Sequence, residues 1–226
     1  ITGGLAEEAS SPPHQVRFSG PEVLKLDWNT RAPRASDFND DGLPDLALIN
    51  QDRSRIEILL QSAKGAQPGT PDAKSRTDIW NPILELSRFT KQPLVVGKGM
   101  YALVTGDWNG DGRADLAYTT DDDKLVLRIR GQEAGDWTQK REFTLDSVSD
   151  DADSLLAVDI NGDKRTDIAV VTETRLQVYL QDDKAGWKEP LSYALTAKGC
   201  SALGAADLNG DGRADLLIRG SWNPSS

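Results

Sequence analysis

Cysteine and histidine are almost absent from this sequence, which contains one of each, Cys200 and His14. A single cysteine excludes an intrachain disulfide bond. The single histidine lies in a proline-rich stretch and is interpreted as part of an exposed linker, so no Ser–His–Asp catalytic set can be assembled around it. No apolar run approaches the roughly 18 residues that a membrane-spanning helix needs. The sequence therefore predicts neither a disulfide-stabilised protein nor a hydrolase of that kind, and it predicts no membrane insertion.

Positive charge is scarce as well. The 226 residues carry 36 acidic and 26 basic side chains, which gives a formal net charge of −10. Such a surface repels nucleic acid and anionic lipid, so we expect neither as a partner. The hydrophobic share of 38% is ordinary for a soluble globular protein, and the length suits one large or two small domains. Because the first residue is Ile1 and not Met, we expect a processed chain or a fragment of a longer one.

A nine-residue acidic motif recurs four times along the chain. It follows the pattern D-x-N-x-D-G-x-x-D, and the one departure is Lys164 at the glycine position of the third copy. The copies begin 70, 52 and 48 residues apart, a period that suits one blade of a β-propeller or one turn of a solenoid. The four copies occupy residues 37–45, 107–115, 159–167 and 207–215.

Apolar segments around each motif predict strands. Every copy is followed by an apolar stretch, and the last three copies are also preceded by one. Alternating apolar residues come next in the first three units, at 56–60, 125–129 and 176–180, and indicate strands with one buried face. A further apolar pair follows a tryptophan: Leu84 and Leu86 after Trp80, Phe143 and Leu145 after Trp137, and Tyr193 and Leu195 after Trp187. These patterns predict four antiparallel strands in each unit. The composition of residues 62–79 predicts a surface insertion in the first unit.

The absence of a long helical pattern predicts an all-β protein, a β-propeller built of four-stranded antiparallel blades, with about four blades in this chain. We divide the chain into an N-terminal segment, residues 1–30, and the propeller repeats, residues 31–226. The N-terminal segment contains two predicted strands, Gln15–Phe18 and Val23–Asp27. Either these strands complete the last blade and close a four-bladed ring, or the chain is part of a larger propeller. The rarity of four-bladed rings favours the larger propeller.

The motif has the chemistry of a calcium-binding loop. Ca²⁺ takes about six to eight oxygen ligands. A tight loop offers side chains at its first, third, fifth and ninth positions and a backbone carbonyl at the seventh, while glycine at the sixth position allows the positive φ that folds the chain around the ion. We expect up to four bound Ca²⁺ ions, with the weakest in the third loop, where Lys164 brings strain and positive charge. The seventh-position carbonyls belong to Leu43, Arg113, Arg165 and Arg213.

Two other interpretations of the motif are weaker. EF-hands need an acidic residue at the twelfth position and flanking helices, whereas the twelfth positions here are Leu48, Tyr118, Val170 and Ile218. Ordinary turns also favour Asn, Asp and Gly, but turn chemistry does not require Asp at both the fifth and the ninth position of four copies. Residues 27–29 begin like a copy but lack the later acids and the glycine, so we assign them no metal.

These loops, each set between two apolar strands, resemble the FG-GAP/VCBS repeats of integrin α-subunit propellers and of many exported bacterial proteins. The resemblance covers residues from about 31 to 220 and is most specific in the loops, above all at residues 106–115. It implies that each loop joins the first two strands of a blade. Members usually form seven-bladed propellers, whereas this chain has four loops. The side-chain ligands that the resemblance implies are Asp37, Asn39, Asp41 and Asp45; Asp107, Asn109, Asp111 and Asp115; Asp159, Asn161, Asp163 and Asp167; and Asp207, Asn209, Asp211 and Asp215.

The favoured function is a calcium-stabilised scaffold for extracellular binding or adhesion, not an enzyme. We expect a protein or glycan partner, with self-association or further blades from a longer chain as alternatives. Acidic loops suit millimolar calcium, so the expected location is extracellular, cell-surface or periplasmic. Two alternatives stay open: a lectin-like carbohydrate-binding propeller, in which an exposed Trp108 or Trp222 stacks on a sugar, and the propeller domain of a polysaccharide-active enzyme. Trp137 and Trp187 are expected to pack between blades, and Cys200 to be a small buried residue.

Overall fold

The computed structural model describes residues 26–62, 88–133, 135–182, 186–187, 189–196 and 199–220. These residues form fourteen strands and one short 3-10 helix, which confirms the predicted all-β fold. No helix in this part of the chain is long and apolar enough to cross a membrane. The elements are β1 (Thr30–Ser36), β2 (Asp45–Asn50), η1 (Gln51–Arg53), β3 (Arg55–Gln61), β4 (Phe89–Val95), β5 (Met100–Gly106), β6 (Asp115–Thr120), β7 (Lys124–Ile129), β8 (Gln139–Thr144), β9 (Leu155–Val158), β10 (Asp167–Val171), β11 (Arg175–Tyr179), β12 (Leu191–Ala194), β13 (Cys200–Ala206) and β14 (Asp215–Gly220).

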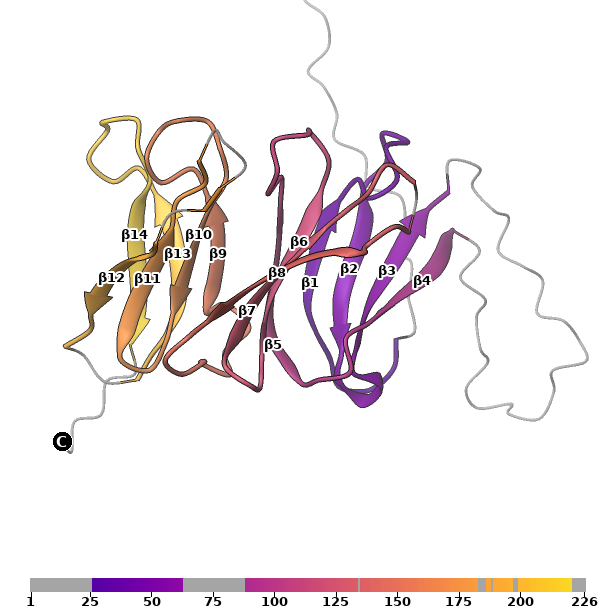
Figure 1. Ribbon diagram of the computed structural model, residues 1–226, viewed down its shortest axis with the longest axis horizontal. Helices are drawn as coiled ribbons and strands as arrows, with labels where there is room; N and C mark the ends of the chain where they lie inside the picture. The colour runs from indigo at the N-terminus through magenta and orange to yellow at the C-terminus, as the bar shows by residue number, and fades with distance from the viewer. Residues whose placement is uncertain are drawn as a thin grey trace, which may run out of the picture.

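The strands form four antiparallel sheets in chain order. Sheet 1 has the order β1-β2-β3-β4, sheet 2 the order β5-β6-β7-β8 and sheet 3 the order β9-β10-β11-β12, while sheet 4 contains β13 and β14 in the described residues. The sheets lie side by side, as Figure 1 shows. Three predicted four-stranded blades are therefore confirmed, and the fourth is present as its first two strands.

The first strands of the four sheets surround one central space. β1 contacts β5, β5 contacts β9, and β9 contacts β13. A cavity of about 310 Å³ lies among these strands and is lined by Arg34 of β1, Val104 of β5, Leu155 of β9 and Leu203 of β13. The remaining strands of each sheet lie progressively farther from this centre, which is the arrangement of propeller blades.

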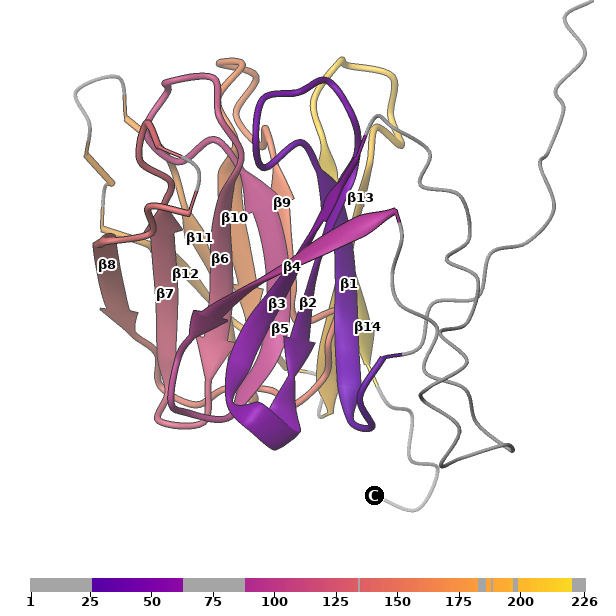
Figure 2. The same ribbon diagram turned by 90° about the vertical axis from the view of Figure 1, so that its right-hand side faces the viewer.

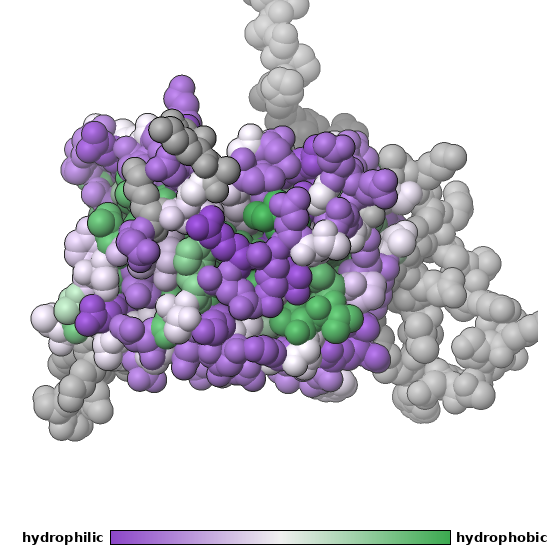
Figure 3. Space-filling model, in the orientation of Figure 1, coloured by the Kyte–Doolittle hydropathy of each residue, from purple (hydrophilic) through white to green (hydrophobic). Residues whose placement is uncertain are grey.

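Apolar side chains fill the space between successive sheets. Ile56 and Ile58 of β3 are fully buried in a cluster that includes Tyr118 of sheet 2. Leu125 of β7 is fully buried in a second cluster with Ile168 of sheet 3. Each such side chain contributes about 1.5–3 kcal/mol relative to an exposed position. The period-2 runs therefore identified strands whose apolar faces meet the neighbouring blade. The outer surface seen in Figure 3 is mostly hydrophilic, with small apolar areas between the polar groups.

Two predictions about the ends of the first unit need separate comment. The predicted strands Gln15–Phe18 and Val23–Asp27 lie outside the described residues, apart from the end of the second one. Most of the predicted insertion and the predicted strand at Leu84 and Leu86 also lie outside them. Within the described residues the fourth strand of sheet 1 is β4, which pairs with β3 along its whole length.

Candidate metal centre

The four acidic motifs form four loops of the same shape at one end of the sheets. Each loop connects the first and second strand of its sheet, as the family resemblance implied. In Figure 2 the loops stand together at the upper end of the molecule. Because consecutive blades repeat the same strand–loop–strand unit, identical motifs are brought to equivalent places around the central cavity.

The first aspartate of each loop organises the backbone around its carboxylate. In the second loop Asp107 Oδ1 accepts from the N–H groups of Gly110 and Asp111, at 2.7 and 3.1 Å, and Oδ2 accepts from Gly112 N–H at 2.7 Å. In the fourth loop the N–H group of Gly212 lowers the pKa of Asp207 through the same bond. Asp207 is therefore ionised at neutral pH. The same three bonds recur at Asp37, Asp159 and Asp207.

The third and fifth positions are joined by a side-chain hydrogen bond. Asn109 Oδ1 accepts from Asp111 N–H at 3.0 Å, and its Nδ2 donates to Asp111 Oδ2 at 3.0 Å. Asp111 Oδ1 accepts from Arg113 N–H at 2.9 Å. The loop is thus a series of Asx turns that close on one another. The corresponding bonds are present in the other three loops, at residues 39–43, 161–165 and 209–213.

The sixth position has positive φ in every loop, as predicted. Gly42, Gly112 and Gly212 have φ of 81°, 82° and 82°, and Lys164 has φ of 69°. Lys164 keeps the hydrogen bond of the glycines, because its N–H donates to Asp159 Oδ2 at 2.8 Å. The third loop therefore adopts the common shape despite its side chain. The ion-pair partner of Asp163 is the neighbouring Arg165, at 3.3 Å.

The ninth aspartate has a structural role that the sequence did not indicate. Asp115 is fully buried; its Oδ2 accepts from Trp108 N–H and its Oδ1 from Arg130 N–H, both at 2.8 Å. Burial raises the pKa of Asp115 to about 6. This carboxylate ties the loop to the residue that follows β7. The equivalent bonds join Asp45 to Phe38 and Gln61, and Asp167 to Ile160 and Gln181.

The donor set of each loop suits a hard cation, since it consists of carboxylate, amide and backbone carbonyl oxygens. In this structure, however, the carboxylates face the N–H groups of their own loops. Across the described ranges, no group of three or more His, Cys, Asp or Glu side chains is gathered closely enough to hold a metal ion. A carboxylate oxygen has about two acceptor sites, so an oxygen that accepts one N–H group can also bind an ion. Ion binding therefore requires some of the loop's hydrogen-bond partners to be exchanged or shared.

The second position of the first two loops packs between blades, whereas Leu208 at this position of the fourth loop is exposed. The Phe38 ring lies 6.2 Å from the Trp137 ring, and the Trp108 ring lies 6.1 Å from the Trp187 ring. The predicted packing role of Trp137 and Trp187 is confirmed. The suggestion that Trp108 is exposed and stacks on a sugar is wrong, because Trp108 is only 3% exposed between sheets 2 and 3. Trp222 lies outside the described residues.

A buried arginine links two of the loops. The side chain of Arg130 is 1% exposed, and its guanidinium donates to Asp40 Oδ1 of the first loop at 2.6 Å. Its own N–H group donates to Asp115 of the second loop. Asp40 is the only acidic residue at the fourth position of the four loops. No local pattern signals this contact, because the two residues are 90 positions apart.

A comparison with protein families gives a match that covers the second, third and fourth loops. The model of FG-GAP-like repeats matches residues 107–170 and 159–218. The chain contains FG-GAP-like repeats. Each matched segment begins at an acidic loop and ends in the strand after the next loop, β10 or β14, so it spans the last three strands of one sheet together with the first strand, the loop and part of the second strand of the next. No curated protein matches the chain at a significant level.

Among solved structures, the FG-GAP-like chain is similar to parts of Tc toxin complexes. One is the Tc holotoxin pore of Photorhabdus luminescens, with 18% identity, a TM-score of 0.47 and coverage of 82% of this chain and 8% of that chain. Another is a TcdB2–TccC3 complex, with 22% identity, a TM-score of 0.37 and coverage of 51% and 6%. A third is a TcdB2–TccC3–Cdc42 complex, with 14% identity, a TM-score of 0.35 and coverage of 83% and 13%. The chain thus spans about an eighth or less of the length of these proteins.

Proposed function

We propose that this β-propeller scaffold of FG-GAP-like repeats binds calcium, one ion in each of its four loops, and that bound calcium stabilises it. The observation that supports the proposal is the fourfold repetition of one acidic loop with the same hydrogen bonds. In this reading the ligands are the side chains at the first, third, fifth and ninth positions and the carbonyl at the seventh. The ion would supply charge neutralisation and would cross-link the loop.

The negative charge of the motif distinguishes a calcium-binding loop from an ordinary hydrogen-bonded turn. Asp111 Oδ1 accepts from Arg113 N–H at 2.9 Å, and Asp111 Oδ2 accepts from Asn109 Nδ2 at 3.0 Å. These hydrogen bonds account for one acceptor on each oxygen, but they do not compensate the repulsion that comes with three carboxylates in one loop. Three carboxylates in each loop repel one another in a chain of net charge −10, and four calcium ions would bring that charge to −2. A cation bound in each loop would offset the repulsion between its carboxylates.

A matched pair of substitutions tests this proposal. Asp111→Asn keeps an oxygen that can accept from Arg113 N–H but removes the charge and the acceptor for Asn109 Nδ2. Asp136→Asn is the control, because Asp136 Oδ1 also accepts from an N–H group two residues later, that of Thr138 at 3.1 Å, outside any acidic motif. At free calcium 100-fold above Kd, each site adds about 2.7 kcal/mol to the free energy of unfolding. Thermal melts in calcium and in EDTA compare the proteins.

We expect calcium to raise the Tm of the wild type and of Asp136→Asn equally. Asp111→Asn should lose a fraction of that increase, while its Tm in EDTA stays within a few degrees of the wild type. If calcium leaves the wild-type Tm unchanged, or if the two variants respond alike, the loops are hydrogen-bonded turns without a metal role.

The same reasoning supports a location and a class of partner. Calcium-linked stability suits compartments with millimolar calcium, so we propose an extracellular, cell-surface or periplasmic protein that acts in binding or adhesion. The partner is a protein or a glycan held on the propeller surface, and no catalytic residues are assigned. A glycan array tests the carbohydrate alternative: specific binding of one glycan class would favour a lectin-like scaffold over protein adhesion.

A further inference from the structure

The fourth position of the first loop departs from the other three loops. Its residue is Asp40, with φ of 62°, whereas the same position is Gly110, Gly162 and Gly210 in the other loops, with φ of 77°, 81° and 78°. This backbone conformation is open to glycine without steric penalty and is unfavourable for residues that carry a Cβ atom. The shape of the loop therefore does not call for an aspartate here, and the contacts of its side chain must explain it.

The side chain of Asp40 contacts Arg130, which follows β7 in sheet 2. The guanidinium donates to Asp40 Oδ1 at 2.6 Å, and the arginine side chain is 1% exposed. Within the described residues Arg130 Nε has no hydrogen-bond partner. A buried guanidinium without a carboxylate partner is strongly unfavourable, so Asp40 offsets the cost of placing Arg130 at this interface. The pair is a specific contact between the first loop and the next sheet.

This pair joins the ligand sets proposed for two calcium ions. The N–H group of Arg130 donates to Asp115 Oδ1 at 2.8 Å, and Asp115 is the ninth residue of the second loop. On the other side, the N–H group of Asp40 donates to Asp37 Oδ1 at 2.7 Å, and Asp37 is the first residue of the first loop. A chain of three hydrogen bonds through Arg130 therefore connects a carboxylate of one proposed site with a carboxylate of the other.

The second loop meets the next sheet without this connection. Gln181 takes the place of Arg130 after β11, since its N–H group donates to Asp167 Oδ1 at 2.9 Å. Gly110 takes the place of Asp40 in the second loop and has no side chain that could accept from Gln181. The second and third loops therefore form a matched control pair within the same chain.

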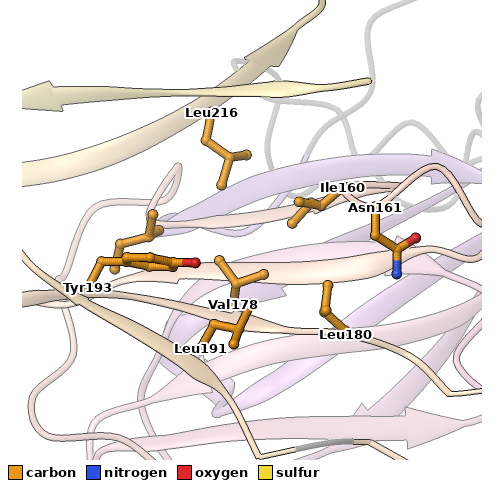
Figure 4. A pocket seen from close by; sticks show the side chains of 8 residues that line it. Ile160, Asn161, Val178, Leu180, Leu191, Tyr193 and Leu216 are labelled. Carbon is orange, nitrogen blue, oxygen red and sulfur yellow. The ribbon is translucent and has the colours of Figure 1, made fainter. Parts of the chain in front are cut away.

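The third loop meets sheet 4 through apolar side chains. Figure 4 shows Ile160, the second residue of this loop, at a pocket of about 360 Å³ that is also lined by Leu216 of β14. The fourth position of the third loop is Gly162, which offers no carboxylate. Among the described interfaces, the one between the first loop and sheet 2 is thus distinguished by an acidic fourth residue.

We propose that Arg130 couples the first and second loops, so that calcium bound in one of them strengthens binding in the other. This inference rests on the proposed function of the loops. An ion that orders the second loop holds Asp115 and, through its hydrogen bond, the backbone of Arg130. The guanidinium then holds Asp40 and the first loop in place, so that this loop loses less conformational freedom when it binds its own ion. Such coupling acts equally in both directions.

Calcium titrations of full chains with one or two working loops measure the coupling. Isothermal titration calorimetry gives the overall constant for filling two loops, which is divided by the product of the two single-loop constants. We expect the resulting factor to be about five or more for the first and second loops, and about one for the second and third loops. The other loops are disabled by Asp→Asn at the fifth position: Asp41, Asp111, Asp163 or Asp211.

Two substitutions outside the ligand sets assign the coupling to Arg130. Asp40→Gly restores the glycine of the other loops, and Arg130→Met removes the charged group. Each should reduce the factor for the first and second loops to about one, while each working loop still binds one ion. In EDTA, Arg130→Met should lower the Tm of the wild type more than that of Asp40→Gly, in which the arginine has already lost its partner.

The outcomes separate the coupling from calcium binding itself. A factor of about one for the unsubstituted first and second loops, a factor that survives Asp40→Gly, or equal losses of Tm in EDTA would overturn the coupling while the loops still bind calcium. Absence of calcium binding by every single-loop protein would overturn the proposed function, and the coupling with it.

Discussion

Replacement of Lys164 by glycine and by glutamine distinguishes two effects of this side chain, backbone strain and positive charge. The sequence predicted strain and positive charge at this position, both of which weaken calcium binding. The structure shows that Lys164 has φ of 69° in a loop with the same backbone hydrogen bond to Asp159 that the glycines make in the other loops. The strain therefore belongs to the folded loop itself and not to the binding step. Lys164→Gly should therefore raise the stability of the protein in EDTA, and its gain in calcium affinity should come from the lost positive charge.

The expected stability change is small and positive. A non-glycine residue in the left-handed region costs roughly 1–2 kcal/mol. Glycine also gives the unfolded chain more conformational freedom, which offsets about 0.5–1 kcal/mol of the gain from relieving this strain. The net gain is about 0.5 kcal/mol, which corresponds to roughly 1–2 °C in Tm for a chain of this size. A thermal melt in EDTA measures this gain without any contribution from calcium.

Lys164→Gln isolates the charge. It keeps a side chain at positive φ but removes the positive charge near the third loop, where Arg165 already pairs with Asp163. We expect both variants to tighten the weakest calcium-binding step by a similar few-fold factor, because screening by water limits the effect of one exposed charge. A glycine variant that is less stable than the wild type in EDTA, or a glutamine variant that equals the glycine variant in stability, would refute the separation of strain from charge.

Three further predictions concern the anchoring residues. Asp115→Asn should lower the free energy of unfolding by about 1–3 kcal/mol in urea titrations even in EDTA, because an amide N–H₂ then faces a backbone donor. Asp215→Asn should cost less, because within the described residues the Asp215 carboxylate accepts one of the two equivalent backbone bonds, that from Leu208 N–H. Arg130→Met should cost about 1–2 kcal/mol in the same assay, since Asp40 is half exposed and can be rehydrated. Trp108→Ala should cost about 3–5 kcal/mol through the cavity left between sheets 2 and 3, and a cost below 1 kcal/mol would contradict its buried position.

Local patterns predicted most of this fold. The alternation at Ile56 and Ile58 identified a strand and its buried face, because a period of two reports burial on one side of a sheet. The motif identified the loops and the positive φ at Lys164, because both depend on residues that are adjacent in the chain. Blade architecture followed from the repeat period, which needs no long-range contact to be recognised.

The features that sequence reasoning missed depend on distant residues. The anchor between Asp115 and Arg130 joins residues 15 positions apart through a backbone N–H group, which every residue type except proline offers. The burial of Trp108 depends on Trp187 in the next blade, so its place inside a surface loop suggested exposure.

The central claim is that the four loops bind calcium, and the most direct test is the number of ions per chain. Native mass spectrometry of the protein, stripped with EDTA and then titrated with calcium, counts the bound ions, and magnesium at the same concentration serves as the control cation. The account predicts stepwise addition up to four calcium ions, with Asp111→Asn stopping at three. A protein that stays free of calcium at millimolar concentration, or that binds ions equally well after Asp111→Asn, would contradict it.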